Sequence, residues 1–97
     1  MKLVLLVVHD DDVNNVADAL LNEEYHITRL ASTGGFLRVG NSLLLCGVED
    51  DRVEPLFEIV RANTEARVLP QMSDWAGDVH VSRAVVFVCN LERCERL

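Results

Sequence analysis

The sequence predicts an α+β protein, a ferredoxin-like sandwich with the order β-α-β-β-α-β and both helices on one face of an antiparallel sheet. Two observations predict this class. Two apolar runs each end in an acidic turn, and each turn leads into a segment with apolar residues at i, i+3, i+4 and i+7. No Pro- or Ser-rich linker divides the 97 residues, so we expect residues 1–97 to form a single domain.

The first strand and helix are predicted from residues 2–20. Residues 2–8 form an apolar run that is too short to cross a membrane and ends at His9 and the aspartates at 10–12. Aspartates at a helix start can accept hydrogen bonds from free N–H groups and favour the positive end of the helix dipole. This capping role is favoured over a metal site that would include His9. The apolar helix face comprises Val13, Val16, Ala17 and Leu20.

The same pattern recurs in the second half of the chain. Residues 27–32 are expected to form a strand, Gly34 and Gly35 a turn, and residues 42–48 a second strand. A helix is predicted from Arg52 to about Asn63. Its apolar face comprises Val53, Leu56, Phe57 and Val60.

The C-terminal third predicts the last strand. Residues 66–69 are expected to be a short extended piece, and residues 70–78 a loop. Residues 79–90 are predicted to form the final strand, interrupted by the polar residues His80, Ser82 and Arg83. Residues 91–97 resemble a short helical tail.

The predicted strands are apolar on both faces, although two helices can cover only one. Residues 3–8, 43–46 and 84–89 do not alternate between apolar and polar side chains. Something must therefore cover the second face, and the simplest candidate is another copy of the chain. A closed homo-oligomer is expected.

Charge and cysteine content exclude several classes of partner. The net charge of -7 disfavours binding to nucleic-acid polymers and insertion into or attraction to anionic membranes. Cys46, Cys89 and Cys94 form an odd set without metal-type spacing, so we interpret them as reduced thiols of a cytoplasmic protein. No metal and no cofactor are expected.

Residues 25–48 contain no carboxylate, whereas 16 acidic residues among 97 would place about four in a segment of this length. The segment does contain His26, Arg29 and Arg38. It is therefore a neutral-to-positive island in an acidic protein, and it suits an anionic ligand.

The island also contains the groups that a nucleotide site needs. The backbone N–H groups of residues 33–35 could form an anion-binding nest, with Phe36 directly beyond it and Asn41 after Gly40. An ordinary hairpin turn with Phe36 as a core anchor remains the alternative. Gly47, inside an apolar strand, indicates either close approach by a ligand or a bulge.

The block from residue 28 to 38, with Gly40, Asn41 and residues 46–50, resembles the signature of the PII-like cyclic-di-AMP receptor family. The resemblance extends over nearly the whole chain. It implies a PII-like homotrimer that binds cyclic di-AMP, without chemistry, in the clefts between subunits and relays binding to an unknown downstream protein through loop rearrangement.

By position, the resemblance also implies the site residues. Thr28, Asn41 and Gly47 would contact polar groups of the ligand. An adenine pocket would be shaped by Gly35, Phe36 and Leu37. Phe87 on the last strand would contact the second base.

The chain departs from the family at His26, where arginine is common, and at Arg96, which replaces an amide side chain that helps hold the ligand. The loop at residues 65–78 is also shorter than is usual.

Two alternatives stay open. A PII-like regulator could bind another nucleotide, such as ATP, or a small anion, although the connection at residues 35–42 is short for the ATP-binding kind. An acylphosphatase-like enzyme would need an arginine after the first strand, where this chain has His9 and three aspartates. Sequence reasoning therefore favours a receptor over an enzyme.

Overall fold

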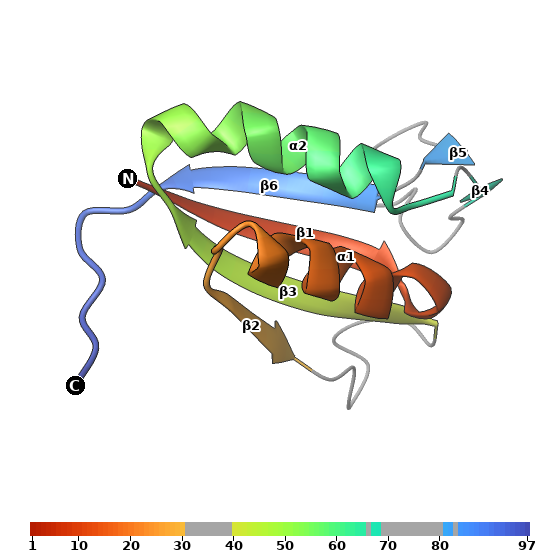
Figure 1. Cartoon of the computed structure of the whole chain (residues 1–97), viewed down its shortest axis with the longest axis horizontal. Helices are drawn as coiled ribbons and strands as arrows, with labels where there is room; N and C mark the ends of the chain where they lie inside the picture. Colours follow the sequence, from red (N-terminus) through yellow and green to blue (C-terminus); the bar gives the residue numbers. More distant parts are fainter. Residues whose placement is uncertain (31–39, 66, 69–80, 83) are drawn as a thin grey trace.

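The fold is that of a computed structural model, which describes residues 1–30, 40–65, 67–68, 81–82 and 84–97 (Figure 1). Strands and helices follow the predicted order. The elements are β1 (Lys2–His9), α1 (Asp10–Asn22), β2 (Ile27–Leu30), β3 (Asn41–Val48), the 3-10 turn η1 (Asp50–Arg52), α2 (Val53–Ala62), β4 (Arg67–Val68), β5 (Val81–Ser82) and β6 (Ala84–Asn90).

The main sheet has four strands in the order β2-β3-β1-β6, and every neighbouring pair is antiparallel. The central strand β1 places Leu5 opposite Leu45 of β3 on one side and opposite Phe87 of β6 on the other. The two βαβ halves are interleaved in this order, since β1 and β3 are the central strands. The ferredoxin-like prediction is confirmed.

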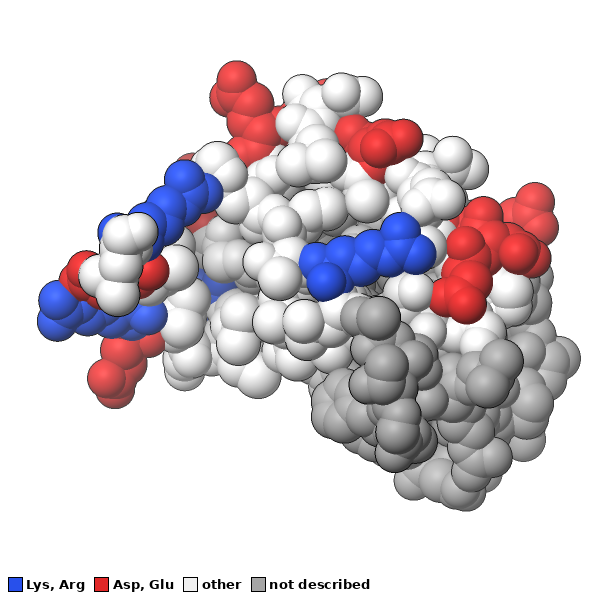
Figure 2. Space-filling model, turned by 90° about the horizontal axis from the view of Figure 1, so that it is seen from below, with Lys and Arg blue, Asp and Glu red and all other residues white. Residues whose placement is uncertain are grey.

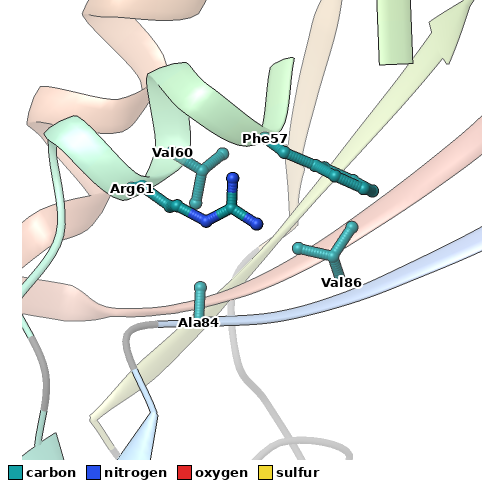
Figure 3. Close-up of a pocket in the computed structure, with 5 residues that line it drawn as sticks. All are labelled: Phe57, Val60, Arg61, Ala84 and Val86. Carbon is teal, nitrogen blue, oxygen red and sulfur yellow. The ribbon is translucent and has the colours of Figure 1, made fainter. Parts of the chain in front are cut away.

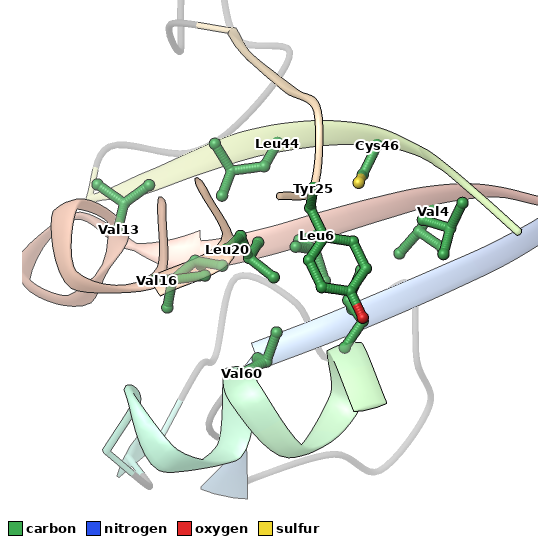
Figure 4. Packing of buried hydrophobic residues seen from close by; sticks show 12 residues of the cluster. Val4, Leu6, Val13, Val16, Leu20, Tyr25, Leu44, Cys46 and Val60 are labelled. Carbon is green, nitrogen blue, oxygen red and sulfur yellow. The ribbon is translucent and has the colours of Figure 1, made fainter. Parts of the chain in front are cut away.

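Helices α1 and α2 lie side by side on one face of this sheet (Figure 1). Val13, Val16 and Leu20 of α1 are fully buried, as the helical spacing predicts, and Leu56 and Val60 of α2 join them. Figure 4 shows Val13, Val16, Leu20 and Val60 packed against residues of β1 and β3. Each such burial contributes about 1.5–3 kcal/mol, so the apolar stripes hold both helices on the sheet.

The start of α1 differs from the expectation that its aspartates form the cap. The N-cap is His9, whose Nδ1 accepts a hydrogen bond from the Asp11 amide at 3.1 Å. The aspartates lie inside the first turn, so their side chains bind elsewhere. Asp10 accepts a bond from the Ser42 hydroxyl at 2.7 Å, and buried Asp12 accepts one from the Glu65 amide at 3.2 Å. The first turn therefore ties α1 to β3 and to the residues after α2.

The opposite sheet face is also apolar, as the strand pattern predicts. Val7 and Leu43 form a second buried cluster, against which further residues pack. Those residues are Leu5, Leu45 and Val85. No helix among the described residues contributes to this cluster, so its packing is separate from the core beneath α1 and α2.

Two C-terminal predictions need correction. Instead of one strand over residues 79–90, β5 pairs with β4 in a separate two-stranded sheet, and β6 begins only at Ala84. Residues 91–97 form no helix, because so short a segment cannot offset the cost of helix nucleation without packing partners. The predicted turn at Gly34 and Gly35 and the loop at residues 70–78 lie outside the described residues.

No helix in the described part of the chain is long and apolar enough to cross a membrane.

Candidate functional site

A groove of about 790 Å³ opens where the starts of β1 and β2, the end of β3 and the C-terminal tail come together. Its volume lies within the range of ligand pockets, about 300–1,000 Å³. It is lined by Met1, Leu3, Leu21, His26, Ile27, Thr28, Leu45, Cys46, Gly47, Leu91, Cys94 and Arg96. The lining is therefore an apolar floor with a few polar groups around it.

Strand register brings the floor together. Thr28 pairs with Leu45, and Gly47 pairs with Leu3, so residues far apart in the sequence become neighbours. Paired residues in an antiparallel sheet point to the same side. Because Leu45 packs on the cluster opposite the helices, Thr28 and Gly47 also lie on that face. The sheet itself aligns the polar edge of the groove.

Gly47 is not required by the backbone or by packing among the described residues. Positive φ occurs at only one glycine in the described part of the chain, Gly40, at 100°. A Cβ built at Gly47 would lie 3.7 Å from Met1 Cε and 3.8 Å from Leu91 Cδ2, which is ordinary contact. The absent side chain instead leaves backbone open to the groove.

The groove is suited to an anion although the molecule as a whole is acidic. Arg96 is the only lysine or arginine among its described lining residues, and none of those residues has a carboxylate side chain. Figure 2 shows basic as well as acidic side chains at the end that carries the C-terminal tail. The basic side chains there offset part of the repulsion that an anion meets from this acidic molecule.

A clamp formed by Tyr25 and Arg52 fixes the chain just before β2. Tyr25 donates a hydrogen bond from its hydroxyl to the Arg52 carbonyl at 2.8 Å, and the Arg52 guanidinium lies 4.0 Å from the centroid of the Tyr25 ring. The same guanidinium donates to the Glu23 carbonyl at 2.5 Å. Burial raises the pKa of Tyr25, so the phenol stays neutral and can donate. The clamp sets where His26 and Thr28 enter the groove wall.

The structure brings together two of the residues predicted for the site, Thr28 and Gly47. Asn41 lies at the other end of β3, about 20 Å from Gly47 at the usual rise per residue. Its side chain is 2% exposed, and its Nδ2 and Oδ1 have no hydrogen-bond partner among the described residues. Phe87, 37% exposed, is on β6, across β3 and β1 from Thr28.

Three predicted site residues, Gly35, Phe36 and Leu37, lie outside the described residues.

Sequence reasoning missed the apolar floor, and in the tail it singled out only Arg96. Leu3, Leu91 and Cys94 line the groove, yet none belongs to the carboxylate-free segment. The pairing of β1 with β3 was implied by the predicted topology and could have indicated Leu3. Leu91 and Cys94 gave no such signal, because an irregular segment has no periodicity to place them.

A smaller hollow of about 370 Å³ lies between α2 and β6 (Figure 3). It is lined by Phe57, Val60, Arg61, Ala84 and Val86. Arg61 extends from α2 over the hollow, but its guanidinium is paired with Glu58 at 2.6 Å. The described residues that line this hollow include no side chain with a hydroxyl group and no glycine. The groove beside the tail is therefore the better candidate for a polar ligand.

Comparisons with known proteins cover the chain from end to end. Residues 1–97 match the family described as "Cyclic-di-AMP receptor". A solved structure of a functionally unknown protein from Pediococcus pentosaceus is similar over 99% of this chain and 96% of that chain, with 32% identity and a TM-score of 0.74.

Proposed function

The chain belongs to the cyclic-di-AMP receptor family, and on that premise we propose that it binds cyclic di-AMP in the groove and performs no chemistry on it. The family resemblance drawn from the sequence is confirmed by a match to residues 1–97. The site residues, the assembly and the output described below are proposals that rest on it.

One observation carries the assignment to the groove: a carboxylate-free pocket with an arginine, in a protein of net charge -7. Cyclic di-AMP has two apolar-faced bases and two anionic phosphodiesters. The floor around Leu3 and Leu45 suits a base face, while the Thr28 hydroxyl and the backbone at Gly47 suit its polar edge. Shape and charge therefore agree with this ligand class.

Asn41 extends the proposed site along β3. A buried amide without a hydrogen bond among the described residues carries a desolvation cost of about 1–3 kcal/mol. A ligand group that bonds to it would recover this cost. Since Asn41 and Gly47 are both on β3, an elongated dinucleotide suits the distance between them better than a single small anion does.

We propose that Phe87 reaches the same ligand from a neighbouring copy. In one chain, Phe87 is three strand spacings from Thr28, about 14 Å. In a cleft between two copies, Thr28 of one subunit and Phe87 of the next could contact one ligand, with Gly35, Phe36 and Leu37 shaping the first adenine pocket.

A homotrimer also explains the helix-free apolar sheet face. On that face Leu5, Leu45 and Val85 are only partly buried and Phe87 is exposed, and the two helices on the other side cannot cover them. Packing three such faces together would remove them from water. A light-scattering mass of three chains supports this assembly, and a mass of one chain contradicts it.

The proposed role is that of a cytoplasmic signalling receptor, whose loops rearrange on binding and pass the signal to a downstream protein. No cofactor besides the ligand is invoked.

Calorimetry with the purified chain tests the function. Cyclic di-AMP is titrated beside cyclic di-GMP and ATP under identical conditions. Saturable binding of cyclic di-AMP, tighter than that of the other two, supports the proposal. Preference for ATP favours the alternative of a PII-like regulator for another nucleotide, and absence of binding at micromolar cyclic di-AMP contradicts the receptor role.

A further inference from the structure

The C-terminal tail forms one wall of the groove. The Leu91 amide donates to the Met1 carbonyl at 3.1 Å, and Lys2 Nζ donates to Asn90 Oδ1. These bonds fix the start of the tail beside β1. Beyond them the tail is irregular and exposed, and it brings Cys94 and Arg96 to the groove.

The two arginines of the tail have different surroundings. Arg93 is paired with Glu95, with its Nε 2.6 Å from a carboxylate oxygen, and it does not line the groove. Arg96 does line the groove, and no carboxylate of the described residues pairs with it. The positive charge of Arg96 is therefore available to a ligand, whereas that of Arg93 is already balanced.

We propose that Arg96 binds a phosphate group of the nucleotide and is the main determinant of charge selection in this groove. This inference rests on the proposed function. A phosphodiester offers two non-bridging oxygens, which match the parallel N–H groups of a guanidinium. Arg96 is the one lysine or arginine among the described lining residues, and the N-terminal ammonium of Met1, which also lines the groove, is paired with Asp50 at 2.9 Å. Arg96 is therefore the group that can neutralise a phosphate there.

Base recognition by Arg96 fits an adenine ligand less well. Guanidinium is a donor only, and it pairs in bidentate fashion with the two adjacent acceptors of guanine, O6 and N7. Adenine places an amino donor next to N7, so a second N–H of arginine would face a donor. A contact to phosphate has no such conflict, and its strength is independent of the base.

The test compares Arg96→Gln and Arg96→Lys with the control Arg93→Gln. Dissociation constants for cyclic di-AMP are measured at low and at high salt. Loss of a charged hydrogen bond is expected to weaken binding by Arg96→Gln roughly ten- to hundredfold and to flatten the salt dependence. Arg96→Lys keeps the charge and should retain part of the affinity and part of the salt dependence. Arg93→Gln should bind as the wild type does.

Because Arg96 is exposed on an irregular tail, the melting temperature should not change in any of these variants. If the wild type binds cyclic di-AMP and Arg96→Gln binds it with the same affinity, the role of Arg96 is overturned while the receptor function is still supported. An equal loss in Arg93→Gln also overturns it, since the effect would then be one of net charge. Failure of the wild type to bind cyclic di-AMP overturns the proposed function itself.

Discussion

Replacing Gly47 by alanine should stabilise the free protein and weaken its binding of ligand. Backbone strain is absent at Gly47, and a methyl group there would meet Met1 Cε at 3.7 Å and Leu91 Cδ2 at 3.8 Å, without overlap. Glycine inside a strand costs about 0.5–1 kcal/mol relative to alanine. The variant should therefore melt roughly 2–8 °C higher, as expected for a domain of this size.

Binding should change in the opposite direction. The added methyl group projects into the groove, where the proposed ligand approaches the backbone of β3. Inserting one methyl group into a filled contact typically costs about 1–3 kcal/mol. That range corresponds to a loss of affinity for cyclic di-AMP of roughly five- to 150-fold.

Thermal denaturation and calorimetry on the same preparation test both halves of this prediction. Gly40→Ala is the matched control, because Gly40 has φ of 100° and an alanine there would be strained by about 1–3 kcal/mol. The control should melt lower. Unchanged ligand affinity in Gly47→Ala would refute the close approach, and a lower melting temperature would refute the claim that the fold does not need this glycine.

Three further predictions concern the residues that hold the site. Tyr25→Phe removes the hydroxyl that donates to the Arg52 carbonyl, and should lower the free energy of unfolding by about 1 kcal/mol in urea denaturation; no change would show that water replaces the bond. A hydrogen bond from the N-terminal ammonium lowers the pKa of Asp50, so its stabilisation is present above the ordinary value of 3.8 and is lost as the pH falls through the lowered value. Asp50→Asn should therefore be less stable than the wild type at neutral pH, and denaturation midpoints of the two proteins should converge in strong acid; a constant difference would contradict this. Burial raises the pKa of Cys46, so its thiol should react with a thiol reagent at neutral pH only when the protein unfolds, whereas the exposed thiol of Cys94 should react quickly. Equal reaction rates of the two thiols would show that the groove admits the reagent.

Much of the fold could be predicted because it follows from periodicity. Val13, Val16 and Leu20 share a helix face by spacing alone, and the structure buries all three. The apolar runs of β1 and β3 predicted burial on both sides, which the separate cluster around Val7 and Leu43 confirms. These are local signals, and each depends only on neighbouring residues in the sequence.

The rest depends on contacts between distant segments. His9 caps α1, while Asp10 and Asp12 accept hydrogen bonds from Ser42 and Glu65, and no local pattern indicates those partners. The tail was expected to be helical, and the structure shows instead an irregular segment that carries Arg96 to the groove. Thr28 was named from the family resemblance and Gly47 both from it and as a glycine inside a strand, and the register of β2, β3 and β1 explains why they lie together.

The most direct test of the central claim is to locate the ligand on the molecule by NMR. Backbone amide shifts of the isotopically labelled protein are followed during titration with cyclic di-AMP. If the groove is the site, the largest changes occur at Thr28, Gly47 and Arg96, while the amides of Phe57 and Arg61 beside the smaller hollow stay in place. Saturable binding that shifts Phe57 and Arg61, and leaves Thr28 and Gly47 unchanged, would contradict the account.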